Sequence, residues 1–268
     1  MTDKPVWRVL PWRTDDPYTC MAIDKTIAES VAAGGSPTIR FYRWAGNGAV
    51  SYGRSQDIAD IATDYCREQG IPSVRRFTEA RAMYHGPMDL TYALAAPVSF
   101  YRTRVDIGIV TSSRIISFLD HIGIRNATQA GYTSVMVQGK KISGSVPYFE
   151  QKKALFQHGG VFCALDYENI ARIYGISEEK LRETTTSIEE ENGRTERIED
   201  IFQACFLDHE YWELGELTVE EQKRIREWSD FFATEEWLLG GNKSRGACSL
   251  HHGPQIPMVV KDFLARIR

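Results

Sequence analysis

Three short segments of the chain carry side chains whose types and spacing could do chemistry. The first spans residues 75–87, between two apolar runs, and contains the basic side chains Arg75, Arg76, Arg81 and His85. Arginine forks bind phosphate or carboxylate through two parallel hydrogen bonds. The segment therefore predicts an anion-binding loop, and a solvated basic loop is the alternative.

The second segment, residues 139–145, reads Gly-Lys-Lys-Ile-Ser-Gly-Ser. Glycines on both sides of the lysines let backbone approach a ligand closely. A lysine in such a place neutralises an oxyanion or a phosphate as a point charge. The alternative is a hairpin turn with an exposed lysine pair. Ser143 and Ser145 do not form a Gly-x-Ser-x-Gly turn, so a serine hydrolase is not indicated.

The third segment, Gln157-His158-Gly159-Gly160, is a polar interruption in an apolar strand. A histidine there is more often a satisfied core residue than a catalyst. Cys248, His251 and His252 have a spacing that metal ligands can have, but adjacent histidines in a tail are usually just exposed, and we expect no metal site.

Hydrophobic periodicity and capping residues outline the elements that must position these segments. A helix should follow Asp57 and end at Gly70, and further helices are expected over residues 17–34, 106–123, 167–174, 177–183, 197–208 and 218–239. Strands are expected over residues 38–44, 49–52, 73–76, 89–96, 133–147 and 153–165. This order predicts an α+β fold, in which helices cover a mixed sheet. Residues 1–240 should form one catalytic domain, and residues 241–268 a tail or small appendage.

Composition excludes several classes of protein. Apolar residues make up 43% of the chain and charged residues 25%, as in a globular protein with a sizeable core. The net charge of −4 argues against a nucleic-acid binder. The five cysteines are dispersed, which indicates neither a disulfide framework nor a zinc ribbon. Without a signal peptide or an apolar run of about 18 residues, we expect no membrane partner and a cytoplasmic location.

Taken together and in order, these segments resemble the lipoate–protein ligase and octanoyltransferase family, which has the biotin/lipoate cofactor-transferase fold related to class II synthetases. The resemblance covers roughly residues 6–240. The segments that carry it are Arg75-Arg76-x-Thr78, Tyr84-His85 with Asp89-Leu90-Thr91-Tyr92, Gly139-x-Lys141-Ile142-Ser143-Gly144-Ser145, His158-Gly159 and Thr185-Thr186-Ser187-Ile188.

The resemblance implies a reaction. ATP, with Mg²⁺, and lipoate or octanoate would form an acyl-adenylate, which a lysine of a lipoyl-acceptor domain then attacks. Lys141 would be the catalytic residue. Arg76, Lys141, Thr186 and Ser187 would bind the nucleotide. The acyl substrate would be bound by Arg43, Arg75, Arg76, Thr78, Glu79, Ala80, Arg81, Ala82, His85, Gly139, Ser143, Gly144, Ser145, His158 and Gly159. Long ligases carry an accessory domain after the catalytic one, and here a separate accessory ligase subunit could supply it.

Two features depart from the family pattern. Glu79-Ala80 replaces a glycine pair, and the glutamate would repel an anionic ligand unless Arg81 or Arg76 pairs with it. An altered substrate, a reshaped but active loop and a non-catalytic paralogue all stay open. Residues 126–132 lack the cysteine that one transferase branch carries there. Octanoyl transfer from an acyl-carrier protein is therefore the alternative activity.

Overall fold

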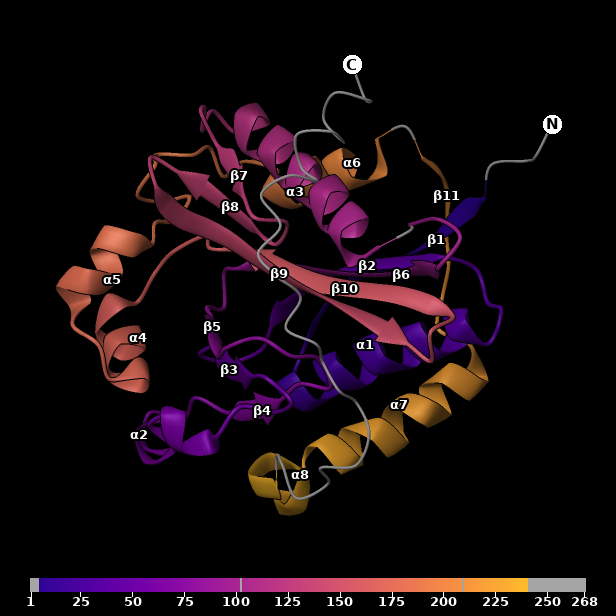
Figure 1. Ribbon diagram of the computed structural model, residues 1–268, viewed down its shortest axis with the longest axis horizontal. Helices are drawn as coiled ribbons and strands as arrows, with labels where there is room; N and C mark the ends of the chain where they lie inside the picture. The colour runs from indigo at the N-terminus through magenta and orange to yellow at the C-terminus, as the bar shows by residue number, and fades with distance from the viewer. Residues whose placement is uncertain (1–4, 102, 209, 241–268) are drawn as a thin grey trace.

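The computed structural model describes residues 5–101, 103–208 and 210–240, which form two sheets with helices around them (Figure 1). The main sheet has eight strands in the order β11-β1-β2-β6-β10-β9-β8-β7. These strands are β1 (Val6–Asp15), β2 (Thr38–Trp44), β6 (Leu90–Pro97), β7 (Thr128–Ala130), β8 (Ser134–Val137), β9 (Lys140–Glu150), β10 (Ala154–Val161) and β11 (Tyr211–Leu214). The small sheet has the order β4-β3-β5, with β3 (Ala49–Tyr52), β4 (Ser73–Arg75) and β5 (Met83–His85).

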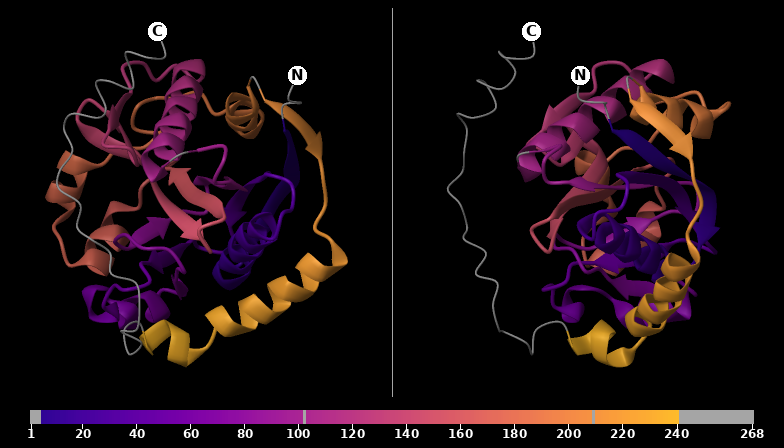
Figure 2. Two further views of the ribbon diagram at one scale, coloured as in Figure 1. Left: turned by 45° about the vertical axis from the view of Figure 1, so that its right-hand side comes forward. Right: turned by 90° about the vertical axis from the view of Figure 1, so that its right-hand side faces the viewer.

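The main sheet is mixed, as predicted. Strand β1 runs parallel to both β2 and β11, whereas β2, β6, β10, β9, β8 and β7 pair antiparallel in turn. Figure 2 shows β11 beside β1 at the edge of the sheet. The α+β prediction is therefore confirmed.

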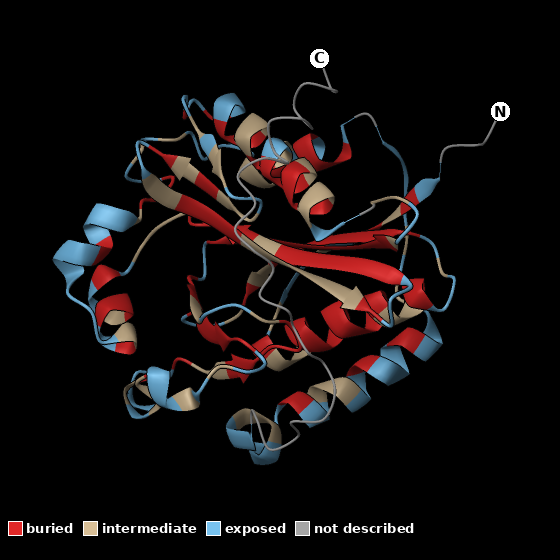
Figure 3. Ribbon diagram, in the orientation of Figure 1, coloured by how far each residue is buried: buried red, intermediate tan, exposed pale blue. Residues whose placement is uncertain are grey.

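Helices cover both faces of this sheet. They are α1 (Pro17–Ala32), η1 (Ile58–Asp60), α2 (Thr63–Glu68), α3 (Arg104–His121), α4 (Tyr167–Tyr174), α5 (Glu178–Thr184), α6 (Ile198–Leu207), α7 (Val219–Phe232) and α8 (Glu235–Gly240). Apolar residues of α3 and α6 form one core with the sheet, and those of α1 and α7 form a second core on the opposite face. In Figure 3 the buried residues follow the central strands and nearly the whole of α1.

Helix α1 begins where the sequence places it. Asp16 is the N-cap, and its side chain accepts hydrogen bonds from the backbone N–H groups of Tyr18 and Thr19. Pro17 follows at the first helical position, where its missing N–H costs nothing. The helix lies between the main sheet and α7, so it buries residues around most of its circumference.

Several predicted boundaries are wrong. Strand β1 was not predicted, because Pro11 and charged residues interrupt its pattern and the pairing with β2 shifts between Leu10 and Arg13. The expected helix 218–239 is two helices, since α7 ends at Phe232 and α8 begins at Glu235. The expected strand 133–147 is a hairpin, in which Gln138 and Gly139 adopt positive φ between β8 and β9. The helix expected after Asp57 is the short η1 followed by α2.

The expected tail, residues 241–268, and the three residues Cys248, His251 and His252 lie outside the described residues. Within the described ranges, no helix is long and apolar enough to cross a membrane.

Candidate active site

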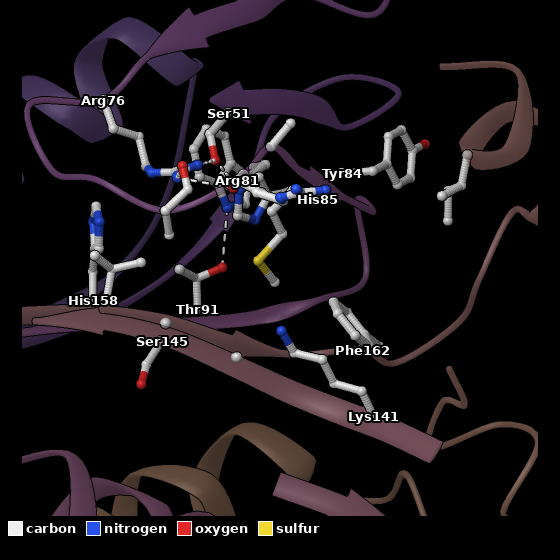
Figure 4. Close-up of a pocket in the computed structure, with 18 of the residues that line it drawn as sticks. Ser51, Arg76, Arg81, Tyr84, His85, Thr91, Lys141, Ser145, His158 and Phe162 are labelled. Carbon is white, nitrogen blue, oxygen red and sulfur yellow. Dashed lines mark hydrogen bonds between the residues drawn. The ribbon is translucent and has the colours of Figure 1, made fainter. Parts of the chain in front are cut away.

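A cavity of about 250 Å³ lies between the small sheet and the main sheet. Its floor comes from β9 and β10, its roof from β5 and the loop before it, and its sides from α1, α4 and α5. Figure 4 shows this arrangement, with the side chains of both sheets directed toward each other. Most of its lining is apolar, which suits a site that holds a hydrocarbon chain away from water.

Lys141 supplies a cation to this cavity from the start of β9. Its Nζ lies 2.8 Å from the position that a Cβ on Gly144 would occupy, so only a glycine leaves room for the amine in this orientation. Burial lowers the pKa of the amine. The structure gives the amine no hydrogen bond and no ion pair within the described residues. A partly buried ammonium without a partner is a place where an anion is expected.

The segment 185–187 lies against the backbone of Lys141. Thr185 forms an isolated parallel bridge with Lys141, and the N–H of Thr186 donates to its carbonyl oxygen at 3.0 Å. Thr185 lines the cavity, and so do Arg76 and Lys141 among the predicted nucleotide-binding residues, but Thr186 and Ser187 do not. Thr186 donates its hydroxyl to Glu191 at 2.7 Å, and Ser187 accepts from the N–H of Glu190 at 3.3 Å. Both side chains therefore stabilise the turn that follows.

Arg76 is buried under the loop that forms the roof. Its Nη1 donates to Ser51 Oγ at 2.7 Å. Its Nη2 donates to three successive carbonyl oxygens, at 2.9, 3.2 and 3.0 Å, which belong to Glu79, Ala80 and Arg81. Burial lowers the pKa of Arg76 to about 10, so the guanidinium stays charged at neutral pH. Arg76 thus holds the loop in place with most of its donors.

The Glu79-Ala80 pair keeps the backbone shape that glycines would allow. Ala80 has φ 78°, in the left-handed region. Gly53 lies so close that a Cβ there would be 2.0 Å from the Ala80 oxygen. The Glu79 carboxylate accepts hydrogen bonds from the N–H and the hydroxyl of Ser55, at 3.2 and 2.8 Å. Neither Arg76 nor Arg81, the two partners considered for Glu79, binds its carboxylate; Ser55 does, and Glu79 does not line the cavity, so the expected repulsion of a ligand there does not arise.

Two buried histidines lie in the cavity wall. His85 Nε2 is 2.7 Å from Ser51 Oγ, and its ring stacks on Trp44 with centroids 4.0 Å apart. His158 Nε2 is 2.9 Å from Thr78 Oγ1, and its Nδ1 is 2.8 Å from Asp24 Oδ2. Burial lowers the pKa of both imidazoles, although Asp24 opposes the shift at His158.

The Thr78–His158–Asp24 chain has the hydrogen-bond order of a nucleophile, a base and an orienting acid. Thr78, however, is fully buried and is not among the residues that line the cavity. The chain therefore acts as a buried polar network in the wall.

Comparison with known proteins agrees with this geometry. Residues 16–209 match the model of the lipoyl protein ligase A/B catalytic domain. The chain belongs to this family. An octanoyltransferase LipM from Exiguobacterium sp. is 30% identical, over 69% of this chain and 75% of the relative.

Solved structures show the same fold at lower identity. The bi-partite lipoate protein ligase of Thermoplasma acidophilum, described with its E2 lipoyl domain, has a TM-score of 0.77 and 21% identity and covers 91% of this chain and 100% of its own. A lipoate-protein ligase A bound with ATP has a TM-score of 0.73 and 21% identity and covers 89% of this chain and 100% of its own.

In this member of the lipoyl ligase family, Arg43 and Arg75 are among the predicted substrate residues that are not brought to the cavity. Arg43 pairs with Glu199 at 2.7 Å and donates to the carbonyl of Met88. Arg75 donates to backbone carbonyls of residues 53, 54, 56, 237 and 238. Both guanidiniums thereby connect segments of the fold.

The remaining predicted residues divide between lining and support. Arg81, Ala82, Gly144, Ser145 and Gly159 line the cavity together with Ala80, His85 and His158. Ser145 does so with its backbone, because its hydroxyl points away in Figure 4 and accepts from Gln157 at 2.7 Å. Ser143 donates to the Gly160 oxygen at 2.7 Å, and Gly139 lies in the hairpin turn.

Sequence reasoning missed the apolar wall. Its members come from helices and strands whose residues read as ordinary core: Met21, Tyr42, Trp44, Phe162, Leu165, Ile170, Tyr174 and Leu181. No signal in the sequence separates an apolar residue that lines a cavity from one that fills a core.

Proposed function

We propose that this protein is an ATP-dependent ligase that activates lipoate or octanoate as an acyl-adenylate and transfers the acyl group to a lysine of a lipoyl-acceptor domain. The observation that carries the proposal is the Lys141 amine, which is partly buried, unpaired within the described residues and directed into a mostly apolar cavity. A medium-chain acid has the matching features, an anionic head and an apolar chain. Each buried CH₂ contributes about 0.8 kcal/mol to binding.

Lys141 can act in both half-reactions. The ammonium would attract the carboxylate and orient it, and it would then stabilise the negative charge that develops on the acyl oxygen during adenylation and during attack by the acceptor amine. Arg81 is exposed at the rim and lines the cavity, and no partner binds its guanidinium within the described residues. We therefore assign phosphate binding to Arg81 in place of Arg76, whose two Nη atoms already donate to Ser51 and the loop.

The second candidate is octanoyl transfer from an acyl-carrier protein, which the name of the LipM relative favours. A thioester intermediate needs a reactive cysteine near Lys141. No cysteine is among the lining residues of the cavity within the described part of the chain. Burial raises the pKa of Cys163 to about 12, and Cys205 packs in the core beside α3. The described thiols thus fit an acyl acceptor poorly.

A partner subunit and magnesium complete the proposal. The Thermoplasma acidophilum ligase is bi-partite and was described with its E2 lipoyl domain. We propose the same two kinds of partner here, an accessory ligase subunit and a lipoyl-acceptor domain. Magnesium would enter as the complex of ATP, because the described residues hold no group of three side chains suited to bind it.

The test supplies each donor separately to the purified protein and an apo-lipoyl domain. Octanoate with ATP and Mg²⁺ should give octanoyl-AMP and a mass increase on one acceptor lysine, with an accessory subunit added where the first step is slow. Synthetic octanoyl-AMP should acylate the acceptor without ATP, and Lys141→Met should slow both steps by about 100- to 1000-fold. Acylation from octanoyl-acyl-carrier protein without ATP would instead establish the transferase. Failure with every donor, although the acid binds, would indicate a non-catalytic paralogue.

A further inference from the structure

Strand β11 is the outermost strand of the main sheet, and all four of its side chains are exposed. The order of the strands ends at β11, so only one of its two edges is paired, with β1 (Figure 2). Tyr211, Trp212 and Leu214 are 61%, 45% and 69% exposed, although large apolar side chains are usually covered. An open sheet edge with such side chains is a place where another chain can add a strand.

The register with β1 shows which backbone groups are available for this. Val9 pairs with Leu214, and the N–H of Gly215 donates to the Val9 carbonyl at 2.9 Å. Successive residues of a strand direct their N–H and C=O groups to opposite edges. The groups of residues 211, 213 and 215 therefore face β1, whereas those of Trp212 and Leu214 face outward. Within the described residues, nothing bonds to these outward groups.

The side chains of β11 alternate between the two faces of the sheet. Trp212 is in register with Trp7, and Leu214 is in register with Val9. Trp7 and Val9 belong to the core that α3 and α6 cover, so the two β11 side chains continue this apolar face past the edge. Glu213 points to the opposite face. An added strand would thus meet an apolar row on one face and a carboxylate on the other.

The edge is also strongly acidic. Residues 208–222 contain no lysine or arginine but six acids, which are Asp208, Glu210, Glu213, Glu216, Glu220 and Glu221. Arg8 is in register with Glu213, but its guanidinium donates to both carboxylate oxygens of Glu221, at 2.9 and 2.7 Å. The carboxylates of Glu213 and Glu216 have no hydrogen bond or ion pair within the described residues. A strand that docks here should therefore carry cationic side chains.

A second copy of this chain fits the edge poorly. Two copies related by a two-fold axis would pair β11 with itself in the antiparallel sense. The pairing that uses the outward groups of both Trp212 and Leu214 places Glu213 directly opposite Glu213 of the second copy. Like charges in this position are destabilising, and the flanking acids of the two copies would also approach each other. The charge of the edge thus favours a different chain.

We propose that β11 is a docking edge for a strand of a protein partner in which apolar side chains alternate with lysine or arginine. The backbone of this strand bonds to the outward groups of Trp212 and Leu214, and its apolar side chains cover these two residues. Its cations lie along Glu213 and the flanking acids. None of the β11 residues lines the cavity, so the inference goes beyond the proposed ligase function and does not depend on it.

A cyclised β-hairpin peptide tests the proposal, because its strands are already ordered before binding. The outer strand of one hairpin alternates valine with lysine, and that of a matched hairpin alternates valine with glutamate. In a nitrogen-15 NMR titration of the full chain, the lysine hairpin should protect the amides of Trp212 and Leu214 from hydrogen exchange. It should bind about 10-fold more tightly than the glutamate hairpin. No protection at the highest soluble concentration, or equal affinity of the two hairpins, would overturn the proposal.

Three variants separate backbone pairing, apolar contact and charge. Leu214→Pro removes only an outward N–H, which an edge strand tolerates, so the protein should stay folded and lose the hairpin. Leu214→Ala keeps this N–H and should lose only part of the affinity. Glu213→Lys should reverse the preference, so that the glutamate hairpin binds more tightly. A folded Leu214→Pro protein that binds the lysine hairpin as well as Leu214→Ala does would show that no strand is added at β11.

The same measurements identify other occupants of the edge. Amides of Trp212 and Leu214 that are already protected in the free protein would show that the edge is covered without a partner. Sedimentation would then assign a dimer to a second copy and a monomer to another segment of this chain, and either result contradicts the proposal. Octanoate binding should be unchanged in all three variants, so a failure of the acyl-binding function is distinguished from a failure of this inference.

Discussion

Lys141 and Arg76 are two cations beside the same cavity, and their surroundings are opposite. The Lys141 amine has no hydrogen bond or ion pair within the described residues, although burial lowers its pKa. Arg76 donates four hydrogen bonds, to Ser51 and to three carbonyl oxygens of the loop. The sequence motifs predicted that both residues bind a ligand.

The difference teaches how to separate binding charges from structural ones. Desolvation of a charge costs free energy, and the fold must compensate for it with its own groups or leave the compensation to a ligand. The fold gives partners to both Nη atoms of Arg76, and only its Nε has none within the described residues. The Lys141 amine has no partner among these residues, so its burial is explained only when an anion occupies the cavity. Substitutions at the two positions should therefore affect different quantities.

The largest effect should follow Lys141→Met, which removes the charge and keeps much of the chain length. We expect acyl transfer to fall by about 100- to 1000-fold, as for loss of one preorganised electrostatic donor. The free energy of unfolding should stay the same or rise, because no hydrogen bond or ion pair of the amine is lost and an unpaired, partly buried charge disappears. Single-turnover transfer assays and urea unfolding measure the two quantities.

Lys140→Met is the matched control, because Lys140 is the preceding residue of the same strand and does not line the cavity. It should leave transfer close to the wild-type rate. Destabilisation by Lys141→Met of the size expected for a core residue would show that the amine is part of the fold after all.

Arg76→Met should have the opposite profile. Removal of the guanidinium leaves three carbonyl oxygens and the Ser51 hydroxyl without their donor, which should lower the free energy of unfolding by about 3 kcal/mol. Thermal and urea unfolding measure this loss.

Arg81 lies five residues after Arg76, at the exposed rim of the cavity. Arg81→Met should therefore weaken ATP binding without lowering the free energy of unfolding. A stable Arg76→Met protein with a selective loss of ATP binding would reverse the two assignments.

Asp89 extends the comparison to a buried carboxylate, for which the hydrogen bonds and charges of the fold offset only part of the cost of desolvation. Its carboxylate accepts from the N–H groups of Gly86 and Cys163, at 2.9 and 2.8 Å. Burial nevertheless raises its pKa to about 7 from 3.8, and these N–H groups and Arg43 oppose the shift. The folded protein thus keeps a proton over a pH range in which the unfolded chain has lost it.

Stability should therefore fall as pH rises through that range, because the folded state binds more protons than the unfolded state. Asp89→Asn cannot ionise. Between pH 5 and pH 8, the free energy of unfolding should therefore fall by about 1 to 3 kcal/mol less in this variant than in the wild type. Urea unfolding at a series of pH values measures the slope. An identical slope in both proteins would show that Asp89 is ionised throughout.

The sequence predicted the family, the mixed sheet and most helices, because periodicity and caps are local properties. It also located Lys141, since glycines on both sides of a lysine are a local pattern. It failed where a property depends on which groups meet in space. Strand β1 is held by its two neighbours despite Pro11. Whether Nη1 of Arg76 finds a partner within the fold depends on Ser51, a residue 25 positions earlier in the chain.

The same limit explains the Glu79 prediction. Repulsion of an anionic ligand was a sound expectation for a carboxylate placed where glycines usually lie. The outcome depends on Ser55, which lies 24 residues earlier in the chain and binds both carboxylate oxygens. The turn that carries Glu79 away from the cavity contains Ala80 in the left-handed region, and no sequence pattern indicates that an alanine will adopt it.

Ala80→Gly therefore tests whether the roof of the cavity is strained, and the expected effect is the smallest. The left-handed conformation costs an alanine about 1 to 2 kcal/mol of folding free energy, and a glycine avoids this cost. Part of the benefit is offset, because the glycine gives the unfolded chain more entropy. We expect the free energy of unfolding to rise by about 0.5 to 1 kcal/mol, with no change in the preference between octanoate and lipoate. Ala82→Gly is the control, since Ala82 has a negative φ. This substitution relieves no strain, so it should lower the free energy of unfolding by a similar amount. If Ala80→Gly destabilised the protein as Ala82→Gly does, the left-handed conformation of Ala80 would carry no net strain, and the four hydrogen bonds that Arg76 donates would be the reason that the loop keeps this shape.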